Sequence, residues 1–215
     1  MIYTIDMMSH EQCDAILEYY NFCQFSDGSK TGSCDKKIKY NLEIDDPRHY
    51  PQLNQYFDSC VKSCLEFSYL FVPRSTTYPL FLQYNTDMHY EYHHDFYMMG
   101  SVRTDYSVTC FFNSPDEYEG GELIIDVGNK LLEYKLDKGK ALVYPTGLKH
   151  KIAPVKSGSR KVAVFWIESV IHDSRIRNIL AEFSNELYNK RKLLGDSIYD
   201  FERIRYQMIR EYGNI

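Results

Sequence analysis

Two histidines and an aspartate stand inside an apolar stretch of the chain, YEYHHDFYMM at residues 90–99. In a strand over 90–97, alternation would place His93 and Asp95 on one face and His94 on the other. Burying a carboxylate without a partner is costly, and a metal cation removes that cost by taking both groups as ligands. A hydrogen-bonded His–Asp pair without metal fits the same spacing, because H-x-D alone is a weak motif.

A second histidine lies in LVYPTGLKHKIAPV, where a Pro-Thr-Gly turn precedes a predicted strand. His150 stands between Lys149 and Lys151, and lysines are seldom buried. We therefore expect both lysines to face water and His150 to face the interior. The alternative is a core histidine that hydrogen-bonds to the backbone.

An arginine follows ten residues later, in SRKVAVFWIES. Because Lys161 should face solvent, alternation turns Arg160, Val164 and Trp166 inward. A buried guanidinium needs a partner. That partner is either a carboxylate of the protein or the carboxylate of a small ligand held in a bidentate clamp.

Two histidines and one carboxylate form the facial triad that is typical of non-haem Fe(II) oxygenases. Zinc accepts the same ligand set, so metal-assisted hydrolysis is the chemical competitor. The inward arginine favours the oxygenase.

These residues need a scaffold that positions them, and the sequence pattern of residues 78–168 predicts one. Short β-branched and aromatic segments alternate there with Gly, Pro, Asn and Asp. We predict strands at 79–85, 90–97, 105–112, 121–127, 130–136, 140–144, 149–155 and 160–168. This spacing is typical of a sandwich, barrel or jelly roll.

Helical patterns flank that core in what we expect to be a single domain over residues 1–215. Residues 1–77 form an N-terminal helical and β support region, with a capping box at Ser9 and a helix over 50–70. Residues 169–215 are predicted to be C-terminal helices.

Composition excludes several classes of partner and location. The net charge is −5 with no basic stripe, so we expect no nucleic-acid or membrane partner. The first residues lack a signal-peptide pattern, and no apolar run approaches membrane-spanning length. None of the cysteines forms a CxxC pair, which favours reduced thiols and a cytoplasmic location. The six are Cys13, Cys23, Cys34, Cys60, Cys64 and Cys110.

Several segments in order resemble one enzyme family. They are FSDGSKTG, KYNLEI, RTDYSVTCFFNSPDEYEGGELII, GKALVYPTGLKHKIAPVKSGSRKVAVFWIES and IHDSRIRNILAEF. From about residue 24 to about residue 190, the chain resembles the 2-oxoglutarate and Fe(II)-dependent dioxygenases of the prolyl hydroxylase superfamily. More narrowly, it resembles the bacterial PKHD-type hydroxylases. It departs from them at His94, in the apolar loop 96–102 and in the last 25 residues or so, which match no motif.

The resemblance implies a mainly β fold with flanking helices, a double-stranded β-helix or jelly roll. It implies Fe(II) held by His93, Asp95 and His150. It also implies that 2-oxoglutarate chelates the iron and sends its far carboxylate to Arg160. Ascorbate would serve as a reductant.

Two further cosubstrate contacts follow from the resemblance, at Tyr84 and Thr109. The implied reaction is hydroxylation of an unactivated C–H bond, in a peptidyl proline or a small amide, with release of succinate and CO2. The substrate is a peptide, a protein or a small molecule. The alternatives are a non-catalytic jelly roll that binds metal and ligand, and an interaction protein with tyrosine-rich surfaces. The loop 96–102 is a substrate lid or a packing element. The oligomeric state stays open.

Overall fold

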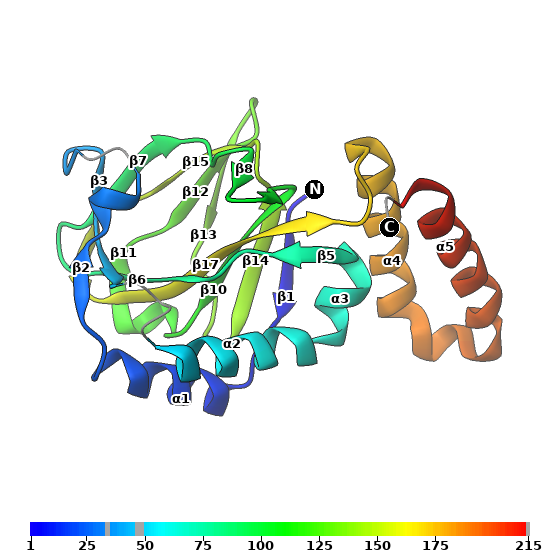
Figure 1. The fold of residues 1–215 in the computed structure, drawn as a ribbon, viewed down its shortest axis with the longest axis horizontal. Helices are drawn as coiled ribbons and strands as arrows, with labels where there is room; N and C mark the ends of the chain where they lie inside the picture. The colour runs from blue at the N-terminus through cyan, green and yellow to red at the C-terminus, as the bar shows by residue number, and fades with distance from the viewer. Residues whose placement is uncertain (33–34, 46–49, 214–215) are drawn as a thin grey trace.

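Two facing antiparallel sheets form the centre of the computed structural model, which describes residues 1–32, 35–45 and 50–213 (Figure 1). Within those residues, the larger sheet has eight strands. Their order is β1 (Tyr3–Asp6), β14 (Lys140–Pro145), β10 (Tyr106–Phe111), β17 (Arg160–Ser169), β6 (Leu80–Tyr84), β4 (Leu42–Ile44) and β2 (Phe25–Asp27), with β5 (Pro73–Thr76) beside β17.

The smaller sheet has five strands among the described residues. Its order is β13 (Leu131–Tyr134), β12 (Leu123–Asp126), β15 (Lys149–Ile152), β7 (His89–His93) and β3 (Lys39–Tyr40). Two small ribbons complete the β structure, β8 (Met98–Met99) with β9 (Val102–Arg103) and β11 (Tyr118–Gly120) with β16 (Val155–Gly158). The predicted jelly roll with flanking helices is confirmed.

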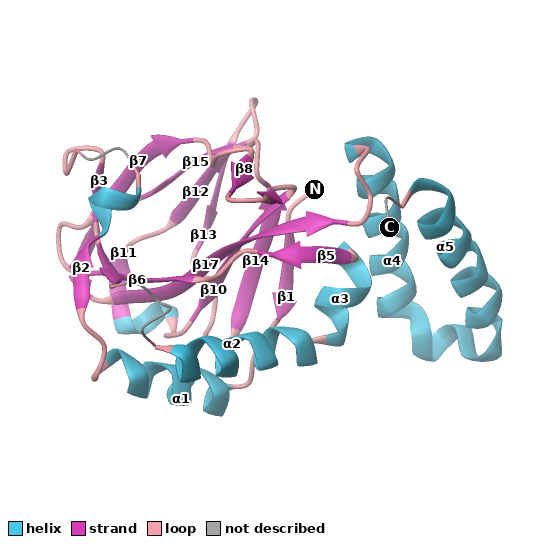
Figure 2. Ribbon diagram, in the orientation of Figure 1, coloured by secondary structure: helices cyan, strands magenta, loops and turns pink. Residues whose placement is uncertain are grey.

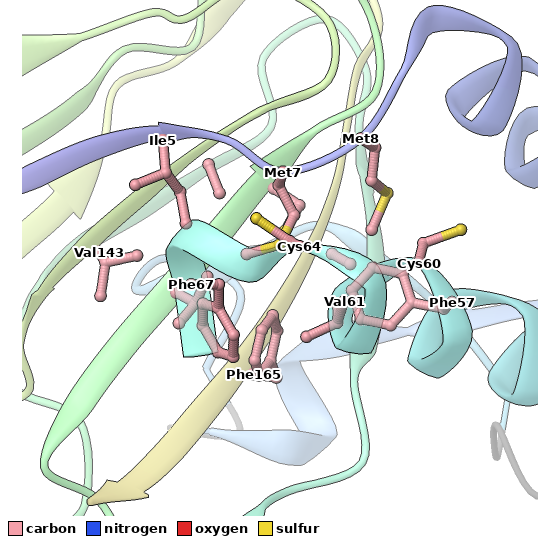
Figure 3. Packing of buried hydrophobic residues seen from close by; sticks show 14 of the residues in the cluster. Ile5, Met7, Met8, Phe57, Cys60, Val61, Cys64, Phe67, Val143 and Phe165 are labelled. Carbon is pink, nitrogen blue, oxygen red and sulfur yellow. The ribbon is translucent and has the colours of Figure 1, made fainter. Parts of the chain in front are cut away.

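Alternation along β17 divides the hydrophobic core into two layers. Val162 faces the space between the sheets, where it packs with Leu123 and Ile152. Phe165, of opposite parity, packs on the other side of the larger sheet beside Phe57 and Phe67 (Figure 3). One strand therefore supports both the helical layer and the lining of the inter-sheet space.

Three N-terminal helices cover the outer face of the larger sheet (Figure 2). They are α1 (His10–Tyr20), α2 (Pro51–Ser63) and α3 (Leu65–Phe71). The Ser9 capping box begins α1 as predicted. The single helix expected over 50–70 is wrong, because Cys64 adopts an extended backbone that separates α2 from α3.

Two C-terminal helices, α4 (Ser174–Leu194) and α5 (Ile198–Tyr212), pack together at one end of the molecule (Figure 1). Asp173 caps α4 by accepting from the backbone of Arg175 and Ile176. The turn between the helices is the 3-10 helix η4 (Gly195–Ser197). No helix in the described part of the chain is long and apolar enough to span a membrane.

The segment KYNLEI divides between the two sheets, because the chain passes at Asn41 from β3 in the smaller sheet to β4 in the larger. A strand prediction also needs correction. The strand expected over 90–97 ends at His93. Asp95 therefore does not follow strand alternation. Cys34 lies outside the described residues.

Candidate metal centre and ligand pocket

Three metal-ligating side chains meet where β7 and β15 pair. The register of these strands places His150 opposite His93, and Asp95 follows β7 by two residues. One ligand atom from each residue lies within 4.8 Å of the others. The Oδ1 atom of Asp95 is 3.6 Å from Nε2 of His93 and 3.7 Å from Nε2 of His150. Sequence reasoning placed these three together, and the structure brings them together.

Both imidazoles are oriented by backbone carbonyls. Nδ1 of His93 is 2.8 Å from the carbonyl oxygen of Glu91, and Nδ1 of His150 is 2.9 Å from that of Leu148. A carbonyl can only accept, so Nδ1 carries the proton in each ring. Each Nε2 then keeps its lone pair and faces the shared centre, which is the tautomer that a metal requires.

The environment keeps His93 neutral. Burial, followed by the nearness of His150, lowers the pKa of His93 to about 4. The ring of Tyr90 stacks on that imidazole with 3.6 Å between centroids. At neutral pH the imidazole of His93 is therefore unprotonated at Nε2 and can serve as a metal ligand.

The other oxygen of Asp95 is already occupied. Its Oδ2 accepts from the hydroxyl of Ser107 at 2.6 Å and from the indole N–H of Trp166 at 2.9 Å. Ser107 in turn lies 3.2 Å from the hydroxyl of Thr146. Sequence analysis gave Ser107 and Trp166 no role at the carboxylate, although the inward parity of Trp166 was the signal for one.

The guanidinium of Arg160 lines the same pocket as the metal-ligating residues. Arg160 is 1% exposed, and its Nε and Nη2 atoms have no hydrogen-bond partner among the described residues. Its guanidinium lies 5.2 Å from the ring centroid of Tyr84 and 5.3 Å from that of Phe111. In the described part of the chain no carboxylate lies within 4.0 Å of it, which counts against the protein-carboxylate alternative. A buried guanidinium whose charge has no counter-ion is destabilising unless an anion binds to it.

Gly121 makes room for that arginine. Its φ is +70°, a left-handed value that favours glycine, and a Cβ there would lie 3.1 Å from Cδ of Arg160. Glycine at this position therefore permits the close approach of the Arg160 side chain.

One cavity joins the metal-ligating cluster to the arginine. Its lining contains every residue predicted for the site, which are His93, Asp95, His150, Arg160, Tyr84 and Thr109. A metal at one end and a guanidinium at the other suit a ligand with an anionic group at each end.

His94 and the following hairpin also reach this cavity. His94 is one of the residues that line this cavity, although it was expected on the opposite face of a strand from His93 and Asp95. His94 still contributes no atom to the three-residue cluster. Phe96 and Met99 line the cavity as well, so the loop 96–102 forms part of its wall.

Comparison with known proteins agrees with the family that the sequence resembles. Residues 79–168 match the family model described as the 2OG-Fe(II) oxygenase superfamily. The chain is 35% identical to a PKHD-type hydroxylase of Gloeothece citriformis over 84% of each chain. It is 30% identical to a PKHD-type hydroxylase of Xylella fastidiosa over 96% of each.

Two solved structures share the fold at low identity. One is a prolyl hydroxylase from Trichoplax adhaerens, in complex with a peptide fragment of the oxygen degradation domain of hypoxia inducible factor. Its TM-score is 0.59 at 17% identity, with 77% of this chain and 82% of that one covered. The other is a prolyl-4-hydroxylase from Pseudomonas putida, with a TM-score of 0.56 at 13% identity over 78% and 92%.

Proposed function

The chain belongs to the PKHD-type hydroxylases of the 2OG-Fe(II) oxygenase superfamily, and we propose that His93, Asp95 and His150 hold its Fe(II). The protein is an Fe(II)- and 2-oxoglutarate-dependent dioxygenase. Bound iron would provide the chemistry that hydroxylates an unactivated C–H bond while 2-oxoglutarate is converted into succinate and CO2. The protein's own residues orient the reactants and exclude water.

The geometry of the three side chains supports the ligand assignment. Two Nε2 lone pairs and the Oδ1 atom of Asp95 face one another from one side of the cavity. This donor set leaves coordination positions open for a chelating oxo acid and for dioxygen.

Arg160 is proposed to bind the far carboxylate of 2-oxoglutarate, with Tyr84 and Thr109 beside it. The observation that supports this is the buried guanidinium whose Nε and Nη2 lack partners among the described residues. A bidentate carboxylate satisfies such a fork in both charge and geometry.

A peptidyl proline or a small amide is the proposed substrate. The solved structures that share the fold are named prolyl hydroxylases, and one of them holds a peptide fragment. The cavity wall at Phe96 and Met99 suits an apolar ring. No nucleic-acid partner is proposed, because the chain carries net charge −5 and no basic stripe.

A cytoplasmic location and one domain complete the proposal. The cysteines described by the structure, Cys13, Cys23, Cys60, Cys64 and Cys110, are all free thiols, as expected in a reducing compartment. Residues 78–168 form the catalytic core, 1–77 support it, and 169–215 add the C-terminal helices.

Succinate release tests this proposal. His93→Ala and Asp95→Ala should abolish Fe(II)-dependent succinate formation from 2-oxoglutarate, while His10→Ala, on the exposed start of α1, should not. Turnover retained in either site variant would refute the ligand assignment. A wild-type protein that binds iron and 2-oxoglutarate but never releases succinate would instead support the binding-module alternative.

A further inference from the structure

Two segments of the family resemblance are not used by the metal or by Arg160. The first contains β2 and the 3-10 helix η1 (Gly28–Thr31), and the second contains β3 and β4. They meet at the wall of the ligand cavity, where Thr31, Gly32 and Lys39 line the same space as the three metal-ligating residues.

A hydroxyl links two buried charges in this wall. Nζ of Lys39 donates to Oγ1 of Thr31 at 2.7 Å, and that hydroxyl donates to Oε2 of Glu43 at 2.7 Å. The ammonium and the Glu43 carboxylate are 3.8 Å apart. Lys39 is 3% exposed and Glu43 is 5% exposed. Burial lowers the pKa of Lys39 and raises the pKa of Glu43.

The local backbone holds the lysine in place. A Cβ on Gly32 would lie 3.0 Å from Cδ of Lys39 and 3.1 Å from the hydroxyl of Tyr90. Asp27 caps the turn that carries Thr31 by accepting from the backbone N–H of Ser29. The lysine stem is therefore packed, and its ammonium has a fixed position.

That position is close to the metal-ligating cluster. Nζ of Lys39 lies 5.3 Å from the ring centroid of Tyr90, and the same ring stacks on His93. Lys39 also lines the same cavity as His93, Asp95 and His150, so a molecule that enters this cavity can approach its ammonium.

The donors of Lys39 are not all used. An ammonium has three N–H groups, and Thr31 accepts one of them. Glu43, at 3.8 Å, is beyond hydrogen-bond distance, and no other acceptor for Nζ occurs among the described residues. Leaving such donors unpaired in a buried site costs free energy, so an arriving acceptor is favoured.

We propose that Lys39 is a specificity-determining residue that donates a hydrogen bond to a carbonyl oxygen of the primary substrate. Glu43 already offsets the charge of Lys39, and Arg160 is assigned to 2-oxoglutarate. Both cations therefore have an anionic partner, and neither requires an anionic group on the substrate. A neutral carboxamide carbonyl, carried by the same ring as the carbon that is hydroxylated, fits this site. The inference rests on the proposed function, whose substrate class it makes more specific.

Three small probes test it through succinate released above the substrate-free rate. They are N-acetylprolinamide, N-acetylpyrrolidine, which lacks the carboxamide carbonyl, and the acid N-acetylproline. Wild-type protein should have the lowest KM for the amide. Lys39→Met should raise that KM by roughly 10- to 100-fold. The same change should raise the KM for N-acetylpyrrolidine much less. Lys30→Met removes an exposed lysine from η1 and is the matched control.

Further variants separate a lost contact from a lost fold. Thr31→Val should reduce the difference in KM between N-acetylprolinamide and N-acetylpyrrolidine, because the Lys39 ammonium loses its hydrogen bond to the Thr31 hydroxyl. Lys39→Met combined with Glu43→Gln removes both buried charges, and it should show the same loss of discrimination with a normal melting curve.

The outcomes are distinct. Unchanged discrimination in a folded Lys39→Met protein overturns this inference alone. If the wild-type protein has a lower KM for N-acetylproline than for the amide, and Lys39→Met removes that difference, the claim that the acceptor is neutral is wrong. If no probe stimulates a wild-type protein that binds iron and 2-oxoglutarate, the proposed substrate class fails, and this inference fails with it.

Discussion

At the scale of single residues, Asp95 shows how the site is prepared for a metal. Ser107 and Trp166 both donate to Oδ2, so only Oδ1 is directed at the two imidazoles. A carboxylate held in this way would offer a bound metal its Oδ1 atom alone. Loss of such outer contacts typically weakens metal affinity by roughly 10- to 100-fold.

Removing these donors should weaken iron binding. Trp166→Phe keeps an aromatic ring but loses the N–H, and Ser107→Ala loses the hydroxyl. Each should reduce Fe(II) affinity roughly 10- to 100-fold in an anaerobic competition titration with a chelator. Ser157→Ala, at an exposed serine of β16, is the control. Unchanged affinity in the double variant would remove the role assigned to both donors.

The lowered pKa of His93 makes the metal-free protein sensitive to acid. The folded value is about 4, against roughly 6.5 for an unperturbed histidine. Between these values the unfolded chain binds more protons, so the free energy of unfolding rises with pH across this window. Stability should therefore fall as pH drops from about 6.5 toward about 4. Urea midpoints measured across this range should show a shallower slope in His93→Gln, and an identical slope would contradict the assignment.

At the scale of elements, a strand end and a glycine turn position the two ends of the cavity. The end of β7 frees Asp95 from alternation, and the turn before β12 brings Gly121 against Arg160. Strand pairing supplies the rest, because β17 and β6 place Arg160 opposite Tyr84. Tyr84, His93 and Arg160 therefore lie where a strand ends or begins.

Gly121→Ala should disturb cosubstrate binding. The new Cβ is strained by a φ of +70° and presses on Cδ of Arg160, so the 2-oxoglutarate concentration for half-maximal turnover should rise several-fold. Gly128→Ala is the matched control, because its φ is +89° but nothing lies within 4 Å of the added methyl group. Equal effects of the two changes on this concentration would show that backbone strain alone is responsible.

At the scale of the whole molecule, one buried carboxylate joins the hairpin, the sheet and the C-terminal helices. Asp105 accepts from Arg103 in β9 at 2.9 Å and from the backbone N–H of Ser169 at 2.9 Å. Arg177 of α4 lies 3.1 Å from it. The position of the hairpin beside the cavity is thereby coupled to the docking of α4.

Asp105→Asn should be strongly destabilising, because it leaves two arginines without their shared partner. Loss of a buried ion partner typically costs roughly 3 kcal/mol or more. Asp6→Asn breaks an exposed pair with Lys140 and should cost about 1 kcal/mol or less. Chemical denaturation compares the two variants. Similar losses in both would contradict the linking role of Asp105.

Much of the fold follows from local sequence patterns. Period-two segments between residues 78 and 168 predicted β6, β7, β10, β12, β13, β14, β15 and β17, and a capping box predicted the start of α1. The strands before residue 78 lie outside these segments. The parity of β17 turned Arg160 and Trp166 inward, as the structure has them. These features are predictable because alternation and capping depend only on neighbouring residues.

Other features depend on contacts between distant segments. The end of β7 at His93, which brings His94 to the cavity, follows from pairing with β15 and not from local propensity. The passage between sheets at Asn41 depends likewise on two different partner strands. The contacts of Lys39 with Thr31 and Glu43 exist only because of that passage.

An anaerobic titration with Fe(II) and 2-oxoglutarate, followed by visible absorption, tests the central claim most directly. Chelation of the iron by the oxo acid produces a weak charge-transfer band. The wild-type protein should develop that band, Asp95→Ala should not, and Arg160→Ala should need far more 2-oxoglutarate to reach it. A full band in Asp95→Ala, or none in the wild-type protein, would contradict a single site built from His93, Asp95, His150 and Arg160.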